Sequence, residues 1–184
     1  MNPEIILAID PGNERSGWAT WNVDEQKLTA CGNDTNEDVR KIVGTAFYNV
    51  CVIERPEVIG QSNIQQEVLD TAVWVGRFAE RASTGNAGCH VGARVHLLTR
   101  RLVKSVITGY QNIPSADSQI IRHLTERFGK KGTKKKPGKL YGISKHAWQA
   151  LAVGIAFDDI RRGNFGRTTD SIKLQIEALL KESA

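Results

Sequence analysis

The chain has 184 residues, of which 40% are hydrophobic and 24% charged, which is the length and composition of one globular domain. No apolar run approaches the roughly 20 residues that span a bilayer, and the first residues lack the basic and apolar regions of a signal peptide, so we expect a protein of the reducing cytosol. Residues 1–90 carry 13 acidic and 7 basic side chains, whereas residues 91–184 carry 7 acidic and 18 basic ones. This division favours a polyanionic partner, nucleic acid above all.

The first 32 residues predict three strands. Residues 5–9 form a short run rich in β-branched side chains that ends at the turn Asp10-Pro11-Gly12. Two extended segments follow at residues 17–23 and 27–32, separated by a polar turn. We therefore expect a three-stranded antiparallel meander.

A helix and a fourth strand come next. Apolar residues recur at helical spacing over residues 37–48, with Asn36 as a candidate cap, and residues 50–53 are a continuous apolar run. Strand, helix and buried strand in this order predict that the first and fourth strands pair in parallel. Residues 64–81 then predict a long amphipathic helix.

The second half predicts one more strand, at residues 93–98, and three more helices. The first helix surrounds residues 120–128, with Ser115 or Asp117 as its cap. The others are expected at residues 144–161 and 171–180. The glycine- and lysine-rich residues 129–142 have no apolar periodicity and predict a mobile loop.

Basic residues are concentrated in this half. Eight of them lie in a 19-residue stretch without an acid: Arg127, Lys130, Lys131, Lys134, Lys135, Lys136, Lys139 and Lys145. The segment after the fifth strand adds more. A solvated surface loop is the simpler interpretation of a lysine run. With the charge division, we expect a DNA-binding surface made by Arg100, Arg101, Lys104, Lys134, Lys135, Lys136, Lys139 and Lys145.

The sequence does not support a disulfide framework, a zinc site or a nucleotide-binding loop. Cys31, Cys51 and Cys89 are odd in number and far apart, so neither a disulfide framework nor a zinc site is indicated. His90 and His96 are weak zinc candidates because no cysteine lies near them. Five residues separate Gly132 from the Gly-Lys pair, and leucine follows the lysine, so this is no phosphate-binding P-loop and no nucleotide cofactor is expected.

Acidic residues end the two most apolar strands, Asp10 after the first and Glu54 after the fourth. In a parallel pairing these ends meet at the carboxyl edge of the sheet, where α/β folds place their sites. Two carboxylates there suit a divalent cation. The alternative is structural: Asp10 caps the Pro-Gly turn and Glu54 pairs with Arg55.

A third candidate is His146, on the face of the last long predicted helix, with Gln149 three residues later. Residues at this spacing share one face of a helix. A histidine in such a position is more often a helix-surface residue than a ligand. His146 and Gln149 are candidates for the metal site only in combination with Asp10 and Glu54.

Segments in order along the chain resemble RuvC-type Holliday junction resolvases of the RNase H-like superfamily, most of all phage-encoded members. They are Ile6-Leu7-Ala8-Ile9-Asp10-Pro11-Gly12 with Ser16-Gly17-Trp18-Ala19, then Ile53-Glu54, Val103-Lys104 through Gly109, Ala116-Asp117-Ser118-Gln119-Ile120, and His146-Ala147-Trp148-Gln149-Ala150-Leu151-Ala152. The resemblance covers residues 4–160. It implies an α/β RNase H-like fold, a mixed five-stranded sheet with helices on both faces, with residues 1–166 as the nuclease domain and residues 167–184 as a helical tail.

The resemblance also implies an activity, the hydrolysis of a DNA phosphodiester with two Mg²⁺ ions, for which Mn²⁺ would substitute. Asp10 would bridge the ions, Glu54 would hold one, and His146 would occupy the third position, with Gln149 as the fourth. The substrate would be a four-way junction, cut by a homodimer in the cytoplasm of a bacterial or phage-infected cell. The helix at residues 64–81, where Gly76 permits close approach, is expected to form part of the dimer interface.

Two departures from the family pattern affect this expectation. The family usually has a carboxylate where this chain has Gln149, which supplies an oxygen but no charge. Asp158 and Asp159 cannot replace it, because they lie about 14 Å further along the helix axis at 1.5 Å per residue. The aromatic residue that the family carries shortly after Glu54 is also missing, so Tyr110, Tyr141 and Trp148 are the remaining candidates for stacking at a junction, or else are packing residues.

Three hypotheses follow. The leading one is a metal-dependent endonuclease selective for Holliday junctions or other branched DNA. The second is a junction-binding protein that cuts weakly or not at all because of Gln149. The third is an RNase H-like enzyme with another substrate, such as an RNA–DNA hybrid.

Overall fold

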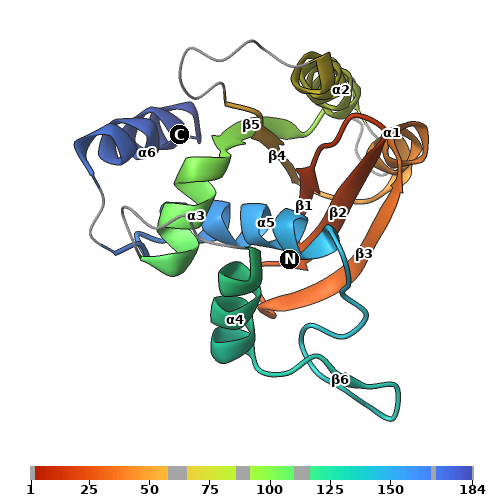
Figure 1. Ribbon diagram of the computed structural model, residues 1–184, viewed down its shortest axis with the longest axis vertical. Helices are drawn as coiled ribbons and strands as arrows, with labels where there is room; N and C mark the ends of the chain where they lie inside the picture. Colours follow the sequence, from red (N-terminus) through yellow and green to blue (C-terminus); the bar gives the residue numbers. More distant parts are fainter. Residues whose placement is uncertain (1–2, 58–65, 86–91, 110–116, 167–168, 184) are drawn as a thin grey trace.

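The computed structural model describes residues 3–57, 66–85, 92–109, 117–166 and 169–183, which form a five-stranded sheet with helices on both faces (Figure 1). The strands are β1 (Ile5–Asp10), β2 (Arg15–Asn22), β3 (Lys27–Thr35), β4 (Val50–Arg55) and β5 (Arg94–Thr99), in the order β3-β2-β1-β4-β5. β1, β2 and β3 are antiparallel neighbours, whereas β1, β4 and β5 are parallel. The mixed five-stranded α/β architecture is confirmed, including the meander and the parallel pairing of the first and fourth strands.

Two hydrophobic clusters, one on each face, explain why β1 and β4 are apolar up to the acidic residues at their carboxyl ends. Ile6 and Ala8 face one cluster, while Leu7 and Ile9 face the other, and all four are almost fully buried. A strand that is covered on both sides does not alternate apolar with polar residues. The parallel register sets Ile9 opposite Ile53, which makes Asp10 and Glu54 neighbours at the carboxyl edge of the sheet.

The helices divide between the two faces. α1 (Asn36–Thr45) and α2 (Gln66–Ser83) pack on one face. On the other lie α3 (Arg100–Thr108), α4 (Asp117–Phe128), α5 (Ala147–Arg161) and α6 (Asp170–Ser183). α5 crosses the sheet with residues 147–160 all buried. A Cβ on Gly154 would lie 3.1 Å from the Cβ of Ala8, so glycine is what lets α5 lie close on β1.

Four local expectations were wrong. Thr35, not Asn36, caps α1 and accepts a hydrogen bond from the Asp38 backbone N–H, while the Asn36 amide is buried. The predicted helix at residues 144–161 begins only at Ala147, because a turn precedes it. The predicted loop at residues 129–142 contains a short hairpin, β6 (Gly132–Thr133) with β7 (Lys136–Pro137). α3 is a helix that the sequence analysis missed.

The C-terminal tail is packed onto the fold. α6 buries Ile172, Ile176 and Leu179 in the same hydrophobic cluster as α3 and α5. Within the described ranges, no helix is both long enough and apolar enough to cross a membrane. Cys31 and Cys51 are free thiols, and Cys89 lies outside the described residues.

Candidate active site

The two predicted carboxylates are brought together at the carboxyl ends of β1 and β4. Their side chains are only 12% exposed for Asp10 and 10% for Glu54. Burial, with the nearby Glu54 charge added, raises the pKa of Asp10 to about 7. Burial also raises the pKa of Glu54, although Arg100 opposes the rise. Two buried carboxylates that repel each other form a site that a cation would stabilise.

Arg100 supplies a positive charge to this site. Thr99 caps α3 by accepting a hydrogen bond from the Leu102 N–H, so Arg100 is the first residue of the helix and lies at the end of β5. Arg100 Nη1 donates to Glu54 Oε1 at 3.0 Å, and its Nη2 donates to Asp117 Oδ1 at 2.6 Å. The alternative in which Glu54 pairs with Arg55 is therefore wrong.

His146 lies beside Asp10, but not on the helix face as predicted. It occupies the N-cap position of α5, after Lys145, whose φ of 48° lies in the left-handed region. His146 Nδ1 is 3.8 Å from Asp10 Oδ2, and the imidazole is 68% exposed. Gly17, which pairs with Asp10 in the sheet, makes this approach possible, because a Cβ there would lie 2.4 Å from the His146 carbonyl oxygen.

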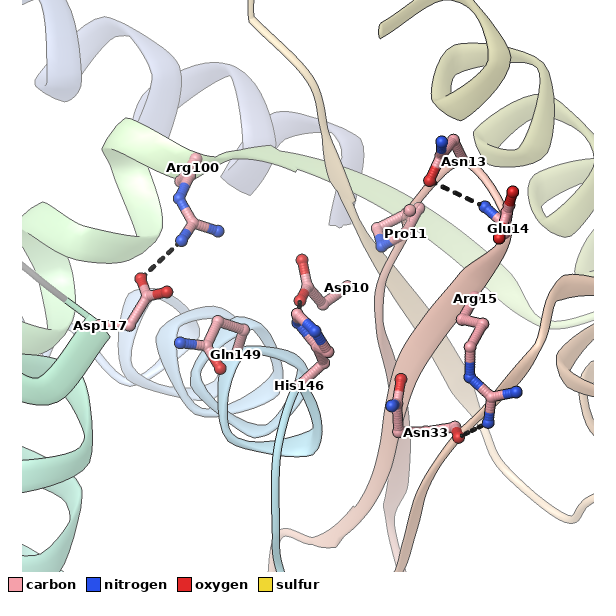
Figure 2. Close-up of a pocket in the computed structure, with 11 residues that line it drawn as sticks. Asp10, Pro11, Asn13, Glu14, Arg15, Asn33, Arg100, Asp117, His146 and Gln149 are labelled. Atoms are coloured by element: carbon pink, nitrogen blue, oxygen red, sulfur yellow. Dashed lines mark hydrogen bonds and ion pairs between the residues drawn. The ribbon is translucent and has the colours of Figure 1, made fainter. Parts of the chain in front are cut away.

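Gln149 follows three residues later, on the first turn of α5, and is only 6% exposed. Its side chain makes no hydrogen bond to any residue that the structure describes. It faces a pocket of about 450 Å³, in which Asp10 and His146 point toward each other and Arg100 reaches Asp117 (Figure 2). The pocket is lined by Asp10, Pro11, Gly12, Asn13, Glu14, Arg15, Asn33, Arg100, Asp117, His146 and Gln149.

The donor set fits one divalent cation. Asp10 and Glu54 offer carboxylate oxygens, and Gln149 offers a neutral one, the ligand types that Mg²⁺ uses. Among the described residues, however, no three His, Cys, Asp or Glu side chains are grouped so that they could hold a metal ion. The third anionic ligand of a two-ion site is thus missing, since position 149 is neutral.

Asp158 and Asp159 do not join the site, as expected from their distance along the helix. Asp158 accepts hydrogen bonds from Arg162 and Gln26. Asp159 receives both terminal nitrogens of Arg127, at 2.5 and 2.7 Å. Arg127 is therefore paired with a buried carboxylate and contributes less to the basic stretch than its position in the sequence suggests.

The predicted DNA-binding residues fall into two groups. Arg100 lies in the pocket, and Arg101 and Lys104 follow it on α3. Exposed lysines form the second group: Lys134 and Lys135 in the turn of the hairpin, Lys136 on β7, then Lys139, and Lys145 next to His146. The Leu28 N–H donates to the Lys139 carbonyl, which ties the base of the hairpin to β3. The second group therefore ends at the pocket.

Asp117 is the functional candidate that the sequence analysis missed. The sequence predicts it as a helix cap and as part of a segment that resembles the family, yet it lines the pocket and binds Arg100. Its place in the segment that resembles the family's helix start was the available signal. Of the candidate stacking residues, Trp148 is 8% exposed and packs in the core, Tyr141 is exposed, and Tyr110 lies outside the described residues.

The mixed sheet, with paired carboxylates at the ends of β1 and β4, has the RNase H-like fold. RuvC from Thermus thermophilus has a similar structure, with a TM-score of 0.59 and 16% sequence identity over 88% of this chain and 98% of that chain. T. thermophilus RuvC in complex with a Holliday junction substrate gives a TM-score of 0.61 and 15% identity, covering 89% and 98%. No family model matches the sequence, and no curated protein does either. The motif resemblance is thus confirmed at the level of the fold.

Proposed function

We propose that this protein is a metal-dependent endonuclease that cuts Holliday junctions or related branched DNA. The observation that carries the proposal is the buried pair Asp10 and Glu54 at the sheet edge of a RuvC-like fold, where Asp10 lines a polar pocket and Glu54 binds Arg100 of the same pocket. Basic residues beside the pocket support a nucleic-acid substrate. The neighbour solved with a Holliday junction suggests which nucleic acid to test first.

Asp10 and Glu54 would hold Mg²⁺, or Mn²⁺ in its place, with Gln149 and His146 beside them. A bound cation would supply the chemistry that the side chains lack, activation of water and stabilisation of the leaving 3′ oxygen. His146 is exposed at the pocket and near Asp10, so its imidazole is placed to orient the attacking water or accept its proton. The lysines from 134 to 145 would hold the DNA backbone across the pocket.

A homodimer is part of the proposal. Leu69, Ala72, Val73 and Gly76 form an exposed stripe along α2, with Leu69 47% and Val73 53% exposed, while Val75 and Phe78 on the other side of α2 are buried. A Cβ on Gly76 would meet nothing within 4 Å, so a second backbone can approach there. A two-fold pairing through this stripe would present two sites to the two symmetric strands of a junction.

The proposal is tested by a panel of synthetic substrates: a four-way junction, a linear duplex of the same sequence and an RNA–DNA hybrid, each with Mg²⁺, with Mn²⁺ and with EDTA. We expect nicks in the junction that require the cation. Asp10→Asn should abolish them and leave junction binding equal or slightly tighter, because one negative charge near the phosphate is removed. Cleavage of the hybrid alone would instead favour the RNase H-like alternative.

A junction-binding protein with weak or no cleavage is the second candidate. Two observations favour it: Gln149 lacks the charge of a carboxylate, and Arg100 already neutralises Glu54. Tight, cation-independent binding of the junction without any nick would identify this function.

A further inference from the structure

The proposed function does not account for a guanidinium inside an acidic site. Arg100 binds Glu54 at 3.0 Å on one side and Asp117 at 2.6 Å on the other. The Glu54 carboxylate is nearly buried, whereas the side chain of Arg100 is 38% exposed toward the pocket. A purely structural ion pair would not need a face open to the space where a substrate phosphate would lie.

The charges of the site can be counted. When ionised, Asp10, Glu54 and Asp117 contribute three negative charges, and Arg100, which binds the last two, contributes one positive charge. Gln149 contributes none, and the opposite charges of Glu14 and Arg15, which also line the pocket, cancel. One divalent cation together with Arg100 would bring three positive charges and balance the acids. Two divalent cations would leave two unbalanced positive charges, with that of Arg100 already included, before any phosphate enters.

We infer that the site uses a single divalent cation and that Arg100 replaces the second, with its guanidinium contacting the scissile phosphate of the DNA. This inference rests on the proposed function. Hydrolysis itself is unchanged: the water oxygen forms a bond to phosphorus, the bond from phosphorus to the 3′ oxygen breaks, the water gives up its proton and the 3′ oxygen gains one. Arg100 stabilises the negative charge that gathers on the phosphate oxygens between these events.

The geometry suits this role. A guanidinium has five N–H donors, and the bonds to Glu54 and Asp117 use two of them, so further donors remain for phosphate oxygens. Asp117 begins α4 and holds the Nη2 end of Arg100. If Glu54 shares its oxygens with a cation, Asp117 still holds Arg100 in place. Asp117 is therefore the positioning residue for Arg100.

Gln149 is consistent with the same arrangement. The residue is only 6% exposed, its side chain lines the pocket, and it makes no hydrogen bond to a described residue. Its amide oxygen is therefore available to a ligand or water in the pocket. A neutral oxygen can complete the coordination shell of one cation. Because it adds no negative charge, it does not require a second cation for charge balance.

The direct test counts ions. Mn²⁺ is titrated into the full chain, with and without a four-way junction, and the free ion is measured by electron paramagnetic resonance. We expect one Mn²⁺ per protomer in the parent chain. We expect two in the double variant Arg100→Gln/Gln149→Asp, because this variant loses the positive charge of the guanidinium and gains a carboxylate. Two ions per protomer in the parent chain would overturn the inference.

A kinetic test addresses Arg100 itself. Arg100→Gln should lower the single-turnover cleavage rate by about 10²- to 10³-fold, the usual effect of losing one donor to a developing negative charge. Junction affinity should fall by much less, because only one phosphate contact is lost. Asp117→Asn should lower the rate less, and Asp117→Glu should restore part of it. Arg40→Gln, an exposed arginine on α1, is the matched control and should cleave like the parent.

The outcomes separate this inference from the proposed function. A parent chain that neither binds Mn²⁺ nor cuts any branched DNA would refute the proposed function. A parent that cuts junctions with two ions bound, or an Arg100→Gln variant that cuts at the parental rate, would refute only the role of Arg100. Because the ion count of the parent needs no variant, a folding defect in Arg100→Gln would not remove the test.

Discussion

Asp10 is placed where its charge opposes folding, so replacing it with asparagine should make the metal-free protein more stable. The carboxylate is 12% exposed, and burial together with Glu54 raises its pKa from 3.8 to about 7. Below pH 3.8 Asp10 is protonated in both the folded and the unfolded chain and carries no penalty. As the pH rises toward 7, the unfolded chain releases this proton and the folded chain keeps it, so the free energy of unfolding falls.

The size of the effect follows from the same shift. Each pKa unit corresponds to about 1.36 kcal/mol, so the full penalty above pH 7 is up to about 4 kcal/mol. Asparagine has nearly the same volume and no charge, so the variant does not bear the free-energy cost of a buried charge at this position. We expect Asp10→Asn to match the parent near pH 4 and to exceed its free energy of unfolding at pH 8 by a value that approaches this limit.

Urea unfolding followed by circular dichroism, in EDTA and at pH values from 4 to 8, measures this difference. Asp170→Asn is the matched control, because its side chain is 96% exposed and should change stability little at any pH. Saturating Mg²⁺ should add about 2.7 kcal/mol to the parent at 100 times the dissociation constant and nothing to Asp10→Asn. A variant that is less stable than the parent at pH 8 in EDTA would mean that Asp10 is not held in a repulsive, buried environment.

Three further predictions concern the DNA surface, the dimer and position 149. Replacing Lys134, Lys135 and Lys136 with alanine should weaken binding to every DNA and reduce the slope of log K against log salt by up to roughly 2.7, whereas an unchanged slope would mean that the hairpin is only solvated surface. Val73→Asp should convert a dimer to a monomer in analytical ultracentrifugation, and Leu174→Asp, at an apolar position 66% exposed on α6, should not. Gln149→Asp should lower the Mg²⁺ concentration for half-maximal cleavage about tenfold, because part of an attraction worth up to about 4 kcal/mol at 4 Å survives desolvation. A rate that is equal or slower across the whole magnesium titration would show that another residue completes the site.

The strands and the acid pair were predictable because their signals are local. An apolar, β-branched run identifies a strand that is covered on both faces, and the order strand, helix, strand predicts a parallel neighbour. From these two facts Asp10 and Glu54 must lie near each other, whatever the details of the helices. The register with Ile9 opposite Ile53 confirms this.

The helices around the site were harder to predict. α3 contains Val103, Val106 and Ile107, β-branched residues that suit a strand as well as a helix, and it becomes helical where Thr99 caps it and Leu102 is buried. Its first residue, Arg100, then reaches Glu54, which is 46 residues away in the sequence. No local pattern predicts such a pairing, so Arg100 was considered only as part of a basic surface.

Arg100 and Gln149 line the same pocket and act on one electrostatic balance. A carboxylate at position 149 would stand in the same pocket as Asp10 and Asp117, where the repulsion around Asp10 is already strong. A glutamine keeps the oxygen and avoids that repulsion, while the guanidinium of Arg100 supplies positive charge without a second ion. Two substitutions that act on one electrostatic balance are expected to be non-additive. The effects of Arg100→Gln and Gln149→Asp on Mn²⁺ affinity should therefore differ in the double variant from the sum of the two single variants, and simple additivity would place the two residues in separate electrostatic environments.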